Sequence, residues 1–151
     1  FDLKEVADAL GEEYGIIVKM HPFVNNPVEI PKGYENRIID LSENSEINDL
    51  LFVTDILITD YSSVVFEASL LDIPMLFYAF DLSEYIATRD FYYEYEPFLP
   101  GKLTQTQDEL VDAIKNEDFE MEKIEPFKHK FFDNLDGKSA ERVASMVKSL
   151  L

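Results

Sequence analysis

The stretch that decides the fold is DILITDYSSVVFEA, residues 55–68. Its first five residues have an apolar middle, as strands buried inside a parallel sheet do. Residues 60–63 then form a polar turn, and apolar side chains at helical spacing follow. The pattern predicts a strand, a tight turn and a helix that runs to about Leu71. We expect Val64, Ala68 and Leu71 to face the core.

The same alternation of strand and helix extends in both directions from this stretch. We expect strands at residues 15–20, 37–40, 55–59 and 73–78. We expect helices at residues 3–10, 42–52 and 64–71, a fourth helix behind Thr106 with Leu110, Val111 and Ile114 on its apolar face, and a last helix with an apolar stripe of Val143, Met146, Val147 and Leu150. Thr106 and Glu109 have the spacing of a capping box before the fourth of these helices. Residues 81–100 are expected to form a long functional loop with short helical turns, and residues 116–135 show no clear pattern.

This alternation predicts an α/β fold, a Rossmann-like parallel sheet flanked by helices, with right-handed crossovers. The chain has 151 residues, 46% of them hydrophobic, which suits one domain with its own core. We therefore expect residues 1–151 to form a single domain. Because the chain opens at Phe1 in a helical pattern, we also expect it to be part of a longer protein.

Composition excludes several classes of function. The net charge of -18 makes nucleic acid a poor partner and disfavours docking on an anionic membrane surface. The chain has no cysteine, which excludes disulfides and thiolate chemistry, and two distant histidines do not make a zinc site. No apolar run approaches the roughly 18 residues of a membrane-spanning helix. No metal site and no cofactor are predicted, and direct membrane insertion is not expected.

The turn after the strand at residues 55–59 is the first candidate site. In open α/β sheets, ligands bind outside the carboxyl ends of the strands, where helix N-termini present free N–H groups. Asp60, Ser62 and Ser63 lie there, and the two serine hydroxyls together with the first-turn amides could hold a phosphate. The structural alternative is simple N-capping by Ser or Asp. Glu67, one helical turn later, could accept hydrogen bonds from a ribose, or it could be an ordinary solvated side chain.

Two further segments carry candidate residues. Lys19 could neutralise a phosphate. His21 could act as an acid, as a base or as a hydrogen-bond donor to a phosphate. A purely structural role for this loop histidine is the alternative. Arg89 lies among aromatic residues and could clamp a phosphate, or it could pair with a neighbouring carboxylate in an aromatic cluster. His129, between two lysines, is expected at the surface.

Several of these segments together resemble the CDP-glycerol glycerophosphotransferase family, whose members build teichoic acids. The resemblance rests on KMHP (residues 19–22), TDYSSVVFEA (residues 59–68), FYAFD (residues 77–81), RDFY (residues 89–92) and LPG (residues 99–101). Their order and spacing agree across the domain. A weaker similarity to nucleotide-sugar 2-epimerases matches the turn and Glu67, although serines stand here where those enzymes have glycines.

The resemblance implies the C-terminal, donor-binding half of a GT-B type transferase. It implies that His21 is catalytic or contacts the phosphates, and that Ser62 and Ser63 hold phosphate. CDP-glycerol would be the donor, and a teichoic acid or lipid-linked acceptor would bind the N-terminal half. The complete protein would then be cytoplasmic, at the inner face of the cell membrane, and this half alone is expected to be inactive.

Two alternatives remain at this point. A GT-B glycosyltransferase that uses a nucleotide sugar could employ the same turn and glutamate. A non-catalytic signalling domain of the receiver type would suit the length and the acidity. That class needs an acidic pair after the first strand, where Lys19 and His21 stand instead.

Overall fold

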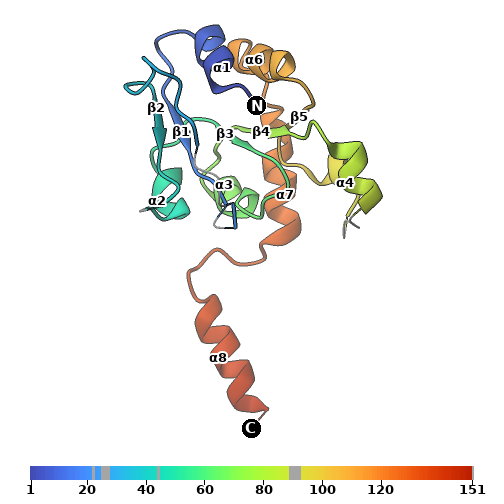
Figure 1. Cartoon of the computed structure of the whole chain (residues 1–151). Helices are drawn as coiled ribbons and strands as arrows, with labels where there is room; N and C mark the ends of the chain where they lie inside the picture. Colours follow the sequence, from blue (N-terminus) through green and yellow to red (C-terminus); the bar gives the residue numbers. More distant parts are fainter. Residues whose placement is uncertain (22, 25–27, 44, 89–92, 151) are drawn as a thin grey trace.

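The computed structural model describes residues 1–21, 23–24, 28–43, 45–88 and 93–150. Strands and helices alternate along most of this chain (Figure 1). The strands are β1 (Ile16–Val18), β2 (Ile38–Asp40), β3 (Leu57–Thr59), β4 (Met75–Tyr78) and β5 (Lys102–Thr104). The helices are α1 (Leu3–Leu10), α2 (Ile47–Leu51), α3 (Val65–Leu70), α4 (Leu82–Thr88), α5 (Tyr95–Phe98), α6 (Gln107–Lys115), the 3-10 helix η1 (Met121–Lys123), α7 (Ile124–Phe131) and α8 (Ser139–Ser149).

The strands form two parallel sheets. β1 pairs with β2, and β3, β4 and β5 pair in that order. Thr59 of β3 lies opposite Phe77 of β4, and Phe77 lies opposite Leu103 of β5. The carboxyl ends of these three strands therefore meet at one edge of the larger sheet. The predicted α/β class, with parallel sheets flanked by helices, is confirmed.

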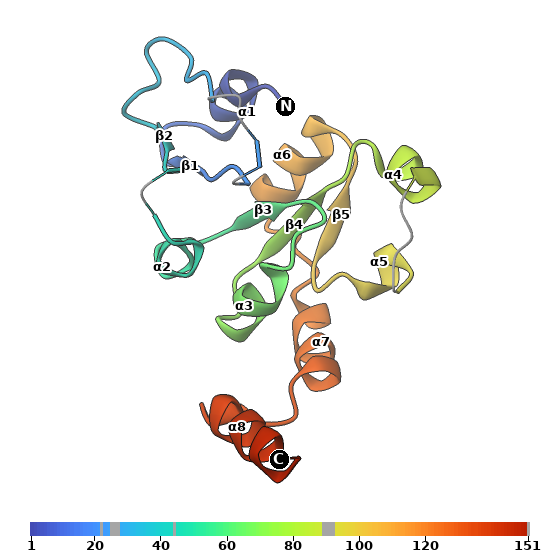
Figure 2. The ribbon, with the colours of Figure 1, turned by 60° about the horizontal axis from the view of Figure 1, so that its bottom comes forward.

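Strand β4 separates two layers of the core. Met75 and Phe77 pack into one apolar cluster with residues of α3 and α7, and Leu76 packs into a second cluster with residues of α1 and α6. Successive side chains of a strand point to opposite faces, which explains the division. Figure 2 shows α1 and α6 on one side of the sheet and α3 and α7 on the other. All three β4 side chains are fully buried.

The predicted helix ends of α1 and α6 are confirmed. Helix α1 stops at Gly11, whose φ of 93° lies in the left-handed region that glycine tolerates. At the start of α6, the hydroxyl of Thr106 accepts the Glu109 amide at 3.2 Å, and the Glu109 carboxylate accepts the Thr106 amide at 3.3 Å. This reciprocal pair is a capping box.

Some of the predicted boundaries were wrong. Strand β5 was not predicted, because its three residues lie between a glycine and a polar turn and show no alternating pattern. The helix expected at residues 42–52 forms only at Ile47–Leu51. The segment 116–135, which had no clear pattern, contains η1 and α7.

The prediction that Leu71 faces the core was wrong. Helix α3 ends at Leu70, and the chain then turns at Asp72, whose φ is +54°. This leaves Leu71 42% exposed. The buried residues of α3 are Val65, Ala68 and Ser69.

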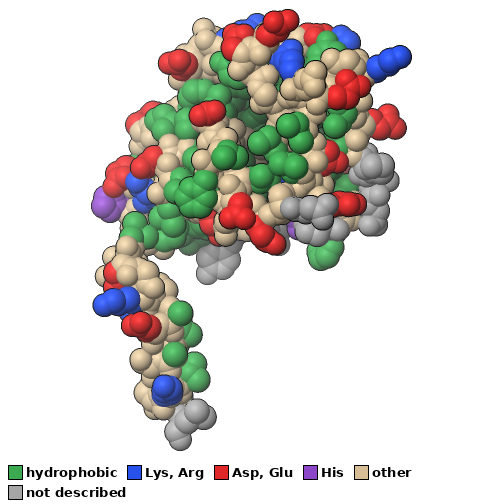
Figure 3. Space-filling view, turned by 90° about the vertical axis from the view of Figure 1, so that its left-hand side faces the viewer, with side chains coloured by type: hydrophobic (Ala, Val, Ile, Leu, Met, Phe, Trp, Pro, Cys, Tyr) green, Lys and Arg blue, Asp and Glu red, His purple; other side chains and the backbone are tan. Residues whose placement is uncertain are grey.

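Helix α8 extends away from the rest of the molecule (Figures 1 and 3). Its predicted apolar stripe exists but is exposed: Val143, Met146, Val147 and Leu150. In Figure 3, hydrophobic side chains gather along one side of this projecting helix. Within the described ranges, no helix is long and apolar enough to cross a membrane.

Candidate functional site

The turn between β3 and α3 brings Asp60, Ser62 and Ser63 together at the carboxyl edge of the larger sheet. The carboxylate of Asp60 accepts a hydrogen bond from the amide of Tyr61 at 2.7 Å. The hydroxyl oxygen of Ser62 accepts one from the amide of Val64 at 3.2 Å. Ser62 thus satisfies one amide of the turn, as the N-capping alternative considered above would require. The proton of the Ser62 hydroxyl remains available to a ligand.

Ser63 is the second serine of the turn that could donate a hydrogen bond to phosphate. Its side chain is exposed, and its hydroxyl makes no hydrogen bond within the described part of the chain. Its main-chain carbonyl accepts the amide of Phe66 at 3.1 Å, which begins the helical winding of α3. Helix α3 has no side-chain hydrogen bond at its N-cap, Val64. The turn therefore presents hydroxyl groups at the place where α/β folds bind ligands.

Tyrosines that the sequence analysis did not select surround this turn. The hydroxyl of Tyr61 donates to the carboxylate of Asp81 at 2.8 Å, and the hydroxyl of Tyr95 donates to the main-chain carbonyl of Asp60 at 2.9 Å. The ring of Tyr61 stacks on that of Tyr85, with centroids 3.7 Å apart. The signal in the sequence was the position of Tyr61 inside the turn. The partners Asp81, Tyr85 and Tyr95 become evident only in three dimensions.

Burial raises the pKa of both hydrogen-bonded tyrosines. For Tyr61, desolvation acts first, followed by the hydrogen bond to Asp81 and its negative charge. For Tyr95, desolvation again acts first, and the charge of Asp60 adds to it. Both effects disfavour the phenolate. The two hydroxyls therefore remain protonated donors near neutral pH.

A small pocket opens beside the turn, with a volume of about 190 Å³. It is lined by Asp60, Tyr61, Ser62, Val65, Phe77, Tyr93, Tyr95, Phe98 and Leu99. Polar groups of the turn form one wall, and aromatic and aliphatic side chains form the rest. This combination is typical of small-molecule sites.

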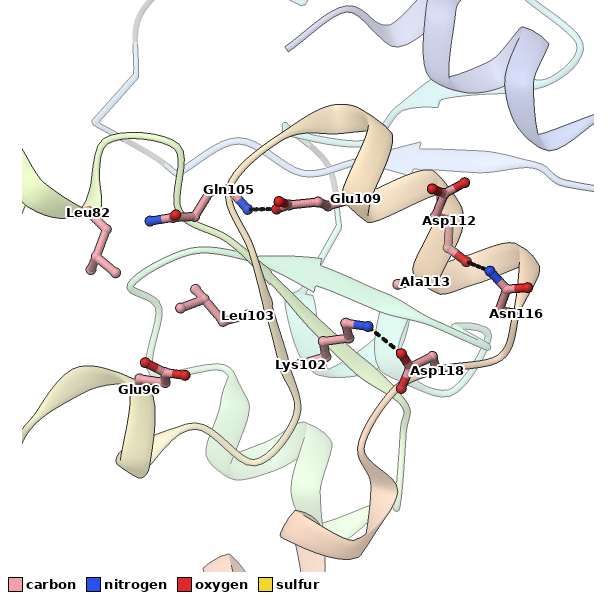
Figure 4. Close-up of a pocket in the computed structure, with 10 residues that line it drawn as sticks. All are labelled: Leu82, Glu96, Lys102, Leu103, Gln105, Glu109, Asp112, Ala113, Asn116 and Asp118. Carbon is pink, nitrogen blue, oxygen red and sulfur yellow. Dashed lines mark hydrogen bonds and ion pairs between the residues drawn. The ribbon is translucent and has the colours of Figure 1, made fainter.

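A larger hollow of about 590 Å³ lies elsewhere, along β5 and α6 (Figure 4). Four carboxylates line it, from Glu96, Glu109, Asp112 and Asp118. Among the described residues that line it, the one cationic side chain is Lys102, which is paired with Asp118. A phosphate would meet repulsion there. We therefore assign the candidate anion site to the smaller pocket at the turn.

The other predicted residues are placed as follows. The ammonium of Lys19 donates to the main-chain carbonyls of Ser42 and Ser45, at 2.9 and 2.6 Å, so it ties the end of β1 to the loop after β2. His21 is exposed, and its Nδ1 accepts the amide of Phe23 at 3.2 Å. In the neutral ring, the proton then lies on Nε2, which can donate to a ligand.

Glu67 is exposed on α3, and Arg89 lies outside the described residues. Within the described part of the chain, no hydrogen bond or ion pair connects Lys19, His21 or Glu67 with the turn at Asp60. The surface position predicted for His129 is confirmed, with a side chain 80% exposed and its Nε2 3.2 Å from Glu125. No group of three or more metal-binding side chains occurs among the residues that the structure describes.

Comparisons with known proteins agree on one family. The sequence pattern of the CDP-glycerol:poly(glycerophosphate) glycerophosphotransferases matches residues 1–149. A teichoic acid poly(ribitol-phosphate) polymerase of Bacillus spizizenii is 48% identical over 146 residues, which are 97% of this chain and 24% of the relative. A teichoic acid glycerol-phosphate transferase of Staphylococcus aureus is 34% identical over 154 residues, which are 97% of this chain and 38% of the relative.

A solved structure agrees with these relatives. A variant of the wall teichoic acid polymerase TagF, soaked with CDPG, superposes with a TM-score of 0.80 at 31% identity, over 98% of this chain and 38% of the chain in that structure. This chain thus spans about a fifth to two-fifths of the length of the curated relatives that it matches. The chain belongs to the CDP-glycerol:poly(glycerophosphate) glycerophosphotransferase family.

Proposed function

We propose that residues 1–151 form the single donor-nucleotide-binding domain of a polyol phosphate transferase. The complete enzyme would move glycerol phosphate from CDP-glycerol to a polyol or teichoic acid acceptor and release CMP. The observation that carries this proposal is the turn at Asp60, where the exposed Ser62 lines an aromatic pocket at the carboxyl edge of the sheet and the exposed Ser63 follows it. Membership of the family supplies the class of donor.

In this reaction, a hydroxyl of the acceptor attacks the β-phosphate of CDP-glycerol. The bond between that phosphorus and the bridging oxygen breaks, and CMP leaves with the electron pair. Ser62 and Ser63 would hold phosphate oxygens by their hydroxyl groups, and neutral donors suit a site in a chain with net charge -18. His21 would donate from Nε2 to the phosphates as negative charge develops on the leaving group. Lys19, Glu67 and Arg89 complete the proposed set of substrate-binding residues.

Sequence outside this chain would supply the acceptor site and the base that deprotonates the acceptor. The acceptor would be a teichoic acid or a lipid-linked precursor of it, and the complete enzyme would work in the cytoplasm, at the inner face of the cell membrane. These statements rest on the family. Co-sedimentation of the complete protein with membranes carrying the acceptor would test them.

Polyol transfer is favoured over glycosyl transfer from a nucleotide sugar. The similar proteins are named as ribitol-phosphate or glycerol-phosphate enzymes. Identity is higher with the ribitol-phosphate polymerase than with the glycerol-phosphate transferase, at 48% against 34%. CDP-ribitol is therefore the second donor to compare with CDP-glycerol.

A transfer assay on the complete protein tests the proposed function. Release of the nucleotide, CMP from CDP-glycerol or CDP-ribitol and UDP from a UDP-sugar, is measured with a teichoic acid acceptor. The proposal predicts CMP release from at least one CDP-polyol and no transfer from the UDP-sugar. Transfer from the UDP-sugar alone would replace the proposal with the glycosyltransferase alternative.

A further inference from the structure

Two hydrogen bonds connect the turn at Asp60 with distant parts of the chain. The hydroxyl of Tyr61 reaches the carboxylate of Asp81, which follows β4, and the hydroxyl of Tyr95 on α5 reaches the carbonyl of Asp60. The ring of Tyr61 is also sandwiched among aromatic neighbours. Its centroid lies 3.7 Å from that of Tyr85 and 5.2 Å from that of Tyr95. Tyr61 therefore ties the turn to the loop after the neighbouring strand.

The bonds inside the turn do not fix its position relative to the sheet. The side chains of Asp60 and Ser62 bond to amides only one and two residues away. Helix α3 has six residues and no side-chain cap, so it adds little stability of its own. The tyrosine contacts supply the long-range restraint that these local bonds lack.

The Tyr61 hydroxyl also reduces the effect of the negative charge of Asp81 on the turn. Asp81 lies at the carboxyl edge of the sheet, as Asp60 does, and both side chains would repel an anionic ligand at the turn. A neutral hydroxyl that donates to Asp81 withdraws part of that negative charge and fixes the direction of the carboxylate. Tyr61 is half-buried and Asp81 is half-buried, so water screens the interaction only in part.

We infer that Tyr61 is a positioning residue of the donor site, which holds the turn at Asp60 in place and directs the charge of Asp81 away from the phosphates of the bound nucleotide. The inference rests on the proposed function, because it assumes an anionic donor at this turn. Tyr61 acts through Asp81 and the main chain of the turn. It need not touch the reacting atoms.

Tyr61→Phe tests the inference because it removes the hydroxyl and keeps the ring on Tyr85. In the complete protein, we expect the KM for the CDP-polyol to rise about tenfold, the size expected for a lost hydrogen bond to a carboxylate. The kcat should stay within about twofold, since the lost interaction serves ground state and transition state alike. The matched control is Tyr14→Phe, far along the chain from the turn, whose hydroxyl makes no hydrogen bond with the described residues.

Asp81→Asn distinguishes positioning of charge from a general structural role. Alone, it should lower the KM for the CDP-polyol, because it removes a negative charge beside the turn. Combined with Tyr61→Phe, it should give a KM close to that of Asp81→Asn alone, because the hydroxyl then has no carboxylate charge to offset, which is coupling and not additivity. A simple structural defect would instead give additive losses and a lower thermal midpoint in the double variant.

The outcomes separate this inference from the function on which it rests. Wild-type protein that transfers neither polyol would overturn the proposed function and this inference with it. Active wild-type protein with an unchanged KM in Tyr61→Phe, or with additive effects in the double variant, would overturn only the inference. If Tyr61→Phe does not fold, Asp81→Asn decides alone: a lower KM supports the inference, and an unchanged or higher KM contradicts it.

Discussion

The hydroxyl of Tyr95 donates a hydrogen bond to the main-chain carbonyl of Asp60 across 35 residues of sequence, at 2.9 Å. This bond connects α5 with the turn whose serine hydroxyls are proposed to donate hydrogen bonds to phosphate. Helix α5 lies in the segment that the sequence analysis expected to be a functional loop. The side chain of Tyr95 is only 7% exposed. Its packing fixes the hydroxyl, and the hydroxyl in turn fixes the carbonyl at the start of the turn.

Replacing Tyr95 with phenylalanine should weaken the domain without unfolding it. The variant keeps the ring and loses one partly buried hydrogen bond, so the free energy of unfolding should fall by about 1 kcal/mol. Urea denaturation followed by circular dichroism measures this change. Tyr14→Phe is the control and should stay within about 0.5 kcal/mol of the wild type. Equal stability of the Tyr95→Phe variant and the wild type would show that the bond contributes nothing.

The same tyrosine predicts how stability depends on alkaline pH. Its pKa in the folded protein lies above the ordinary 10.0, so the unfolded chain loses this proton first as the pH rises. The stabilisation is therefore complete below pH 10.0 and is lost progressively above it. Denaturation curves at a series of pH values from neutral to alkaline should show a decline that is less steep in Tyr95→Phe. An equally steep decline in stability with pH in the two proteins would refute the raised pKa of Tyr95.

The stability of the domain should also be sensitive to a side chain at Gly101, because β5 enters the sheet there. A Cβ at this buried residue would collide with the main-chain carbonyl oxygen of Met75 on β4. Gly101→Ala should lower the free energy of unfolding by about 3 kcal/mol, since main chain cannot yield as a side chain does. In the control, Gly15→Ala, the added carbon lies 3.8 Å from the nearest atom, the carbonyl oxygen of Arg37. A Gly101→Ala variant as stable as Gly15→Ala would mean that β5 is placed differently.

The capping box of α6 can be tested by removing its hydroxyl. Thr106→Ala leaves the Glu109 amide without its partner, so the free energy of unfolding should fall by about 1 kcal/mol. The control is Ser149→Ala, which removes an exposed hydroxyl bonded to Met146 within the projecting helix α8. Chemical denaturation compares the two variants. A larger loss in the control than in Thr106→Ala would contradict the structure of this cap.

The sequence predicted those parts of the fold that depend on local patterns. Continuous apolar runs identified β3 and β4, and the capping box identified the start of α6. Strand β5 was missed because its three residues are specified by pairing with β4, not by their own pattern. Leu71 was misplaced because helical spacing says nothing about where α3 stops.

The residues of the candidate site also divide into those that a local pattern indicates and those that only the folded chain brings together. The turn at Asp60 was selected as a candidate because a polar turn after a buried strand has a known place in α/β folds. The tyrosine contacts were missed because Tyr61 and Asp81 are 20 residues apart and meet only when β3 and β4 pair. The proposal that Lys19 could neutralise a phosphate came from its place at the end of a strand, whereas its bonds to two carbonyls depend on a loop conformation that no short pattern predicts.

A calorimetric titration with CMP, UMP and CDP-glycerol tests the central claim, that the turn at Asp60 binds the donor nucleotide. It compares the complete wild-type protein with Ser63→Ala, and with Ser149→Ala as the control. We predict that the cytidine compounds bind and UMP does not, and that Ser63→Ala weakens binding by about 1 kcal/mol or more, the scale of a lost hydrogen bond. Cytidine binding of equal strength in Ser63→Ala and the wild type, or no binding of any nucleotide by the complete protein, would contradict the account.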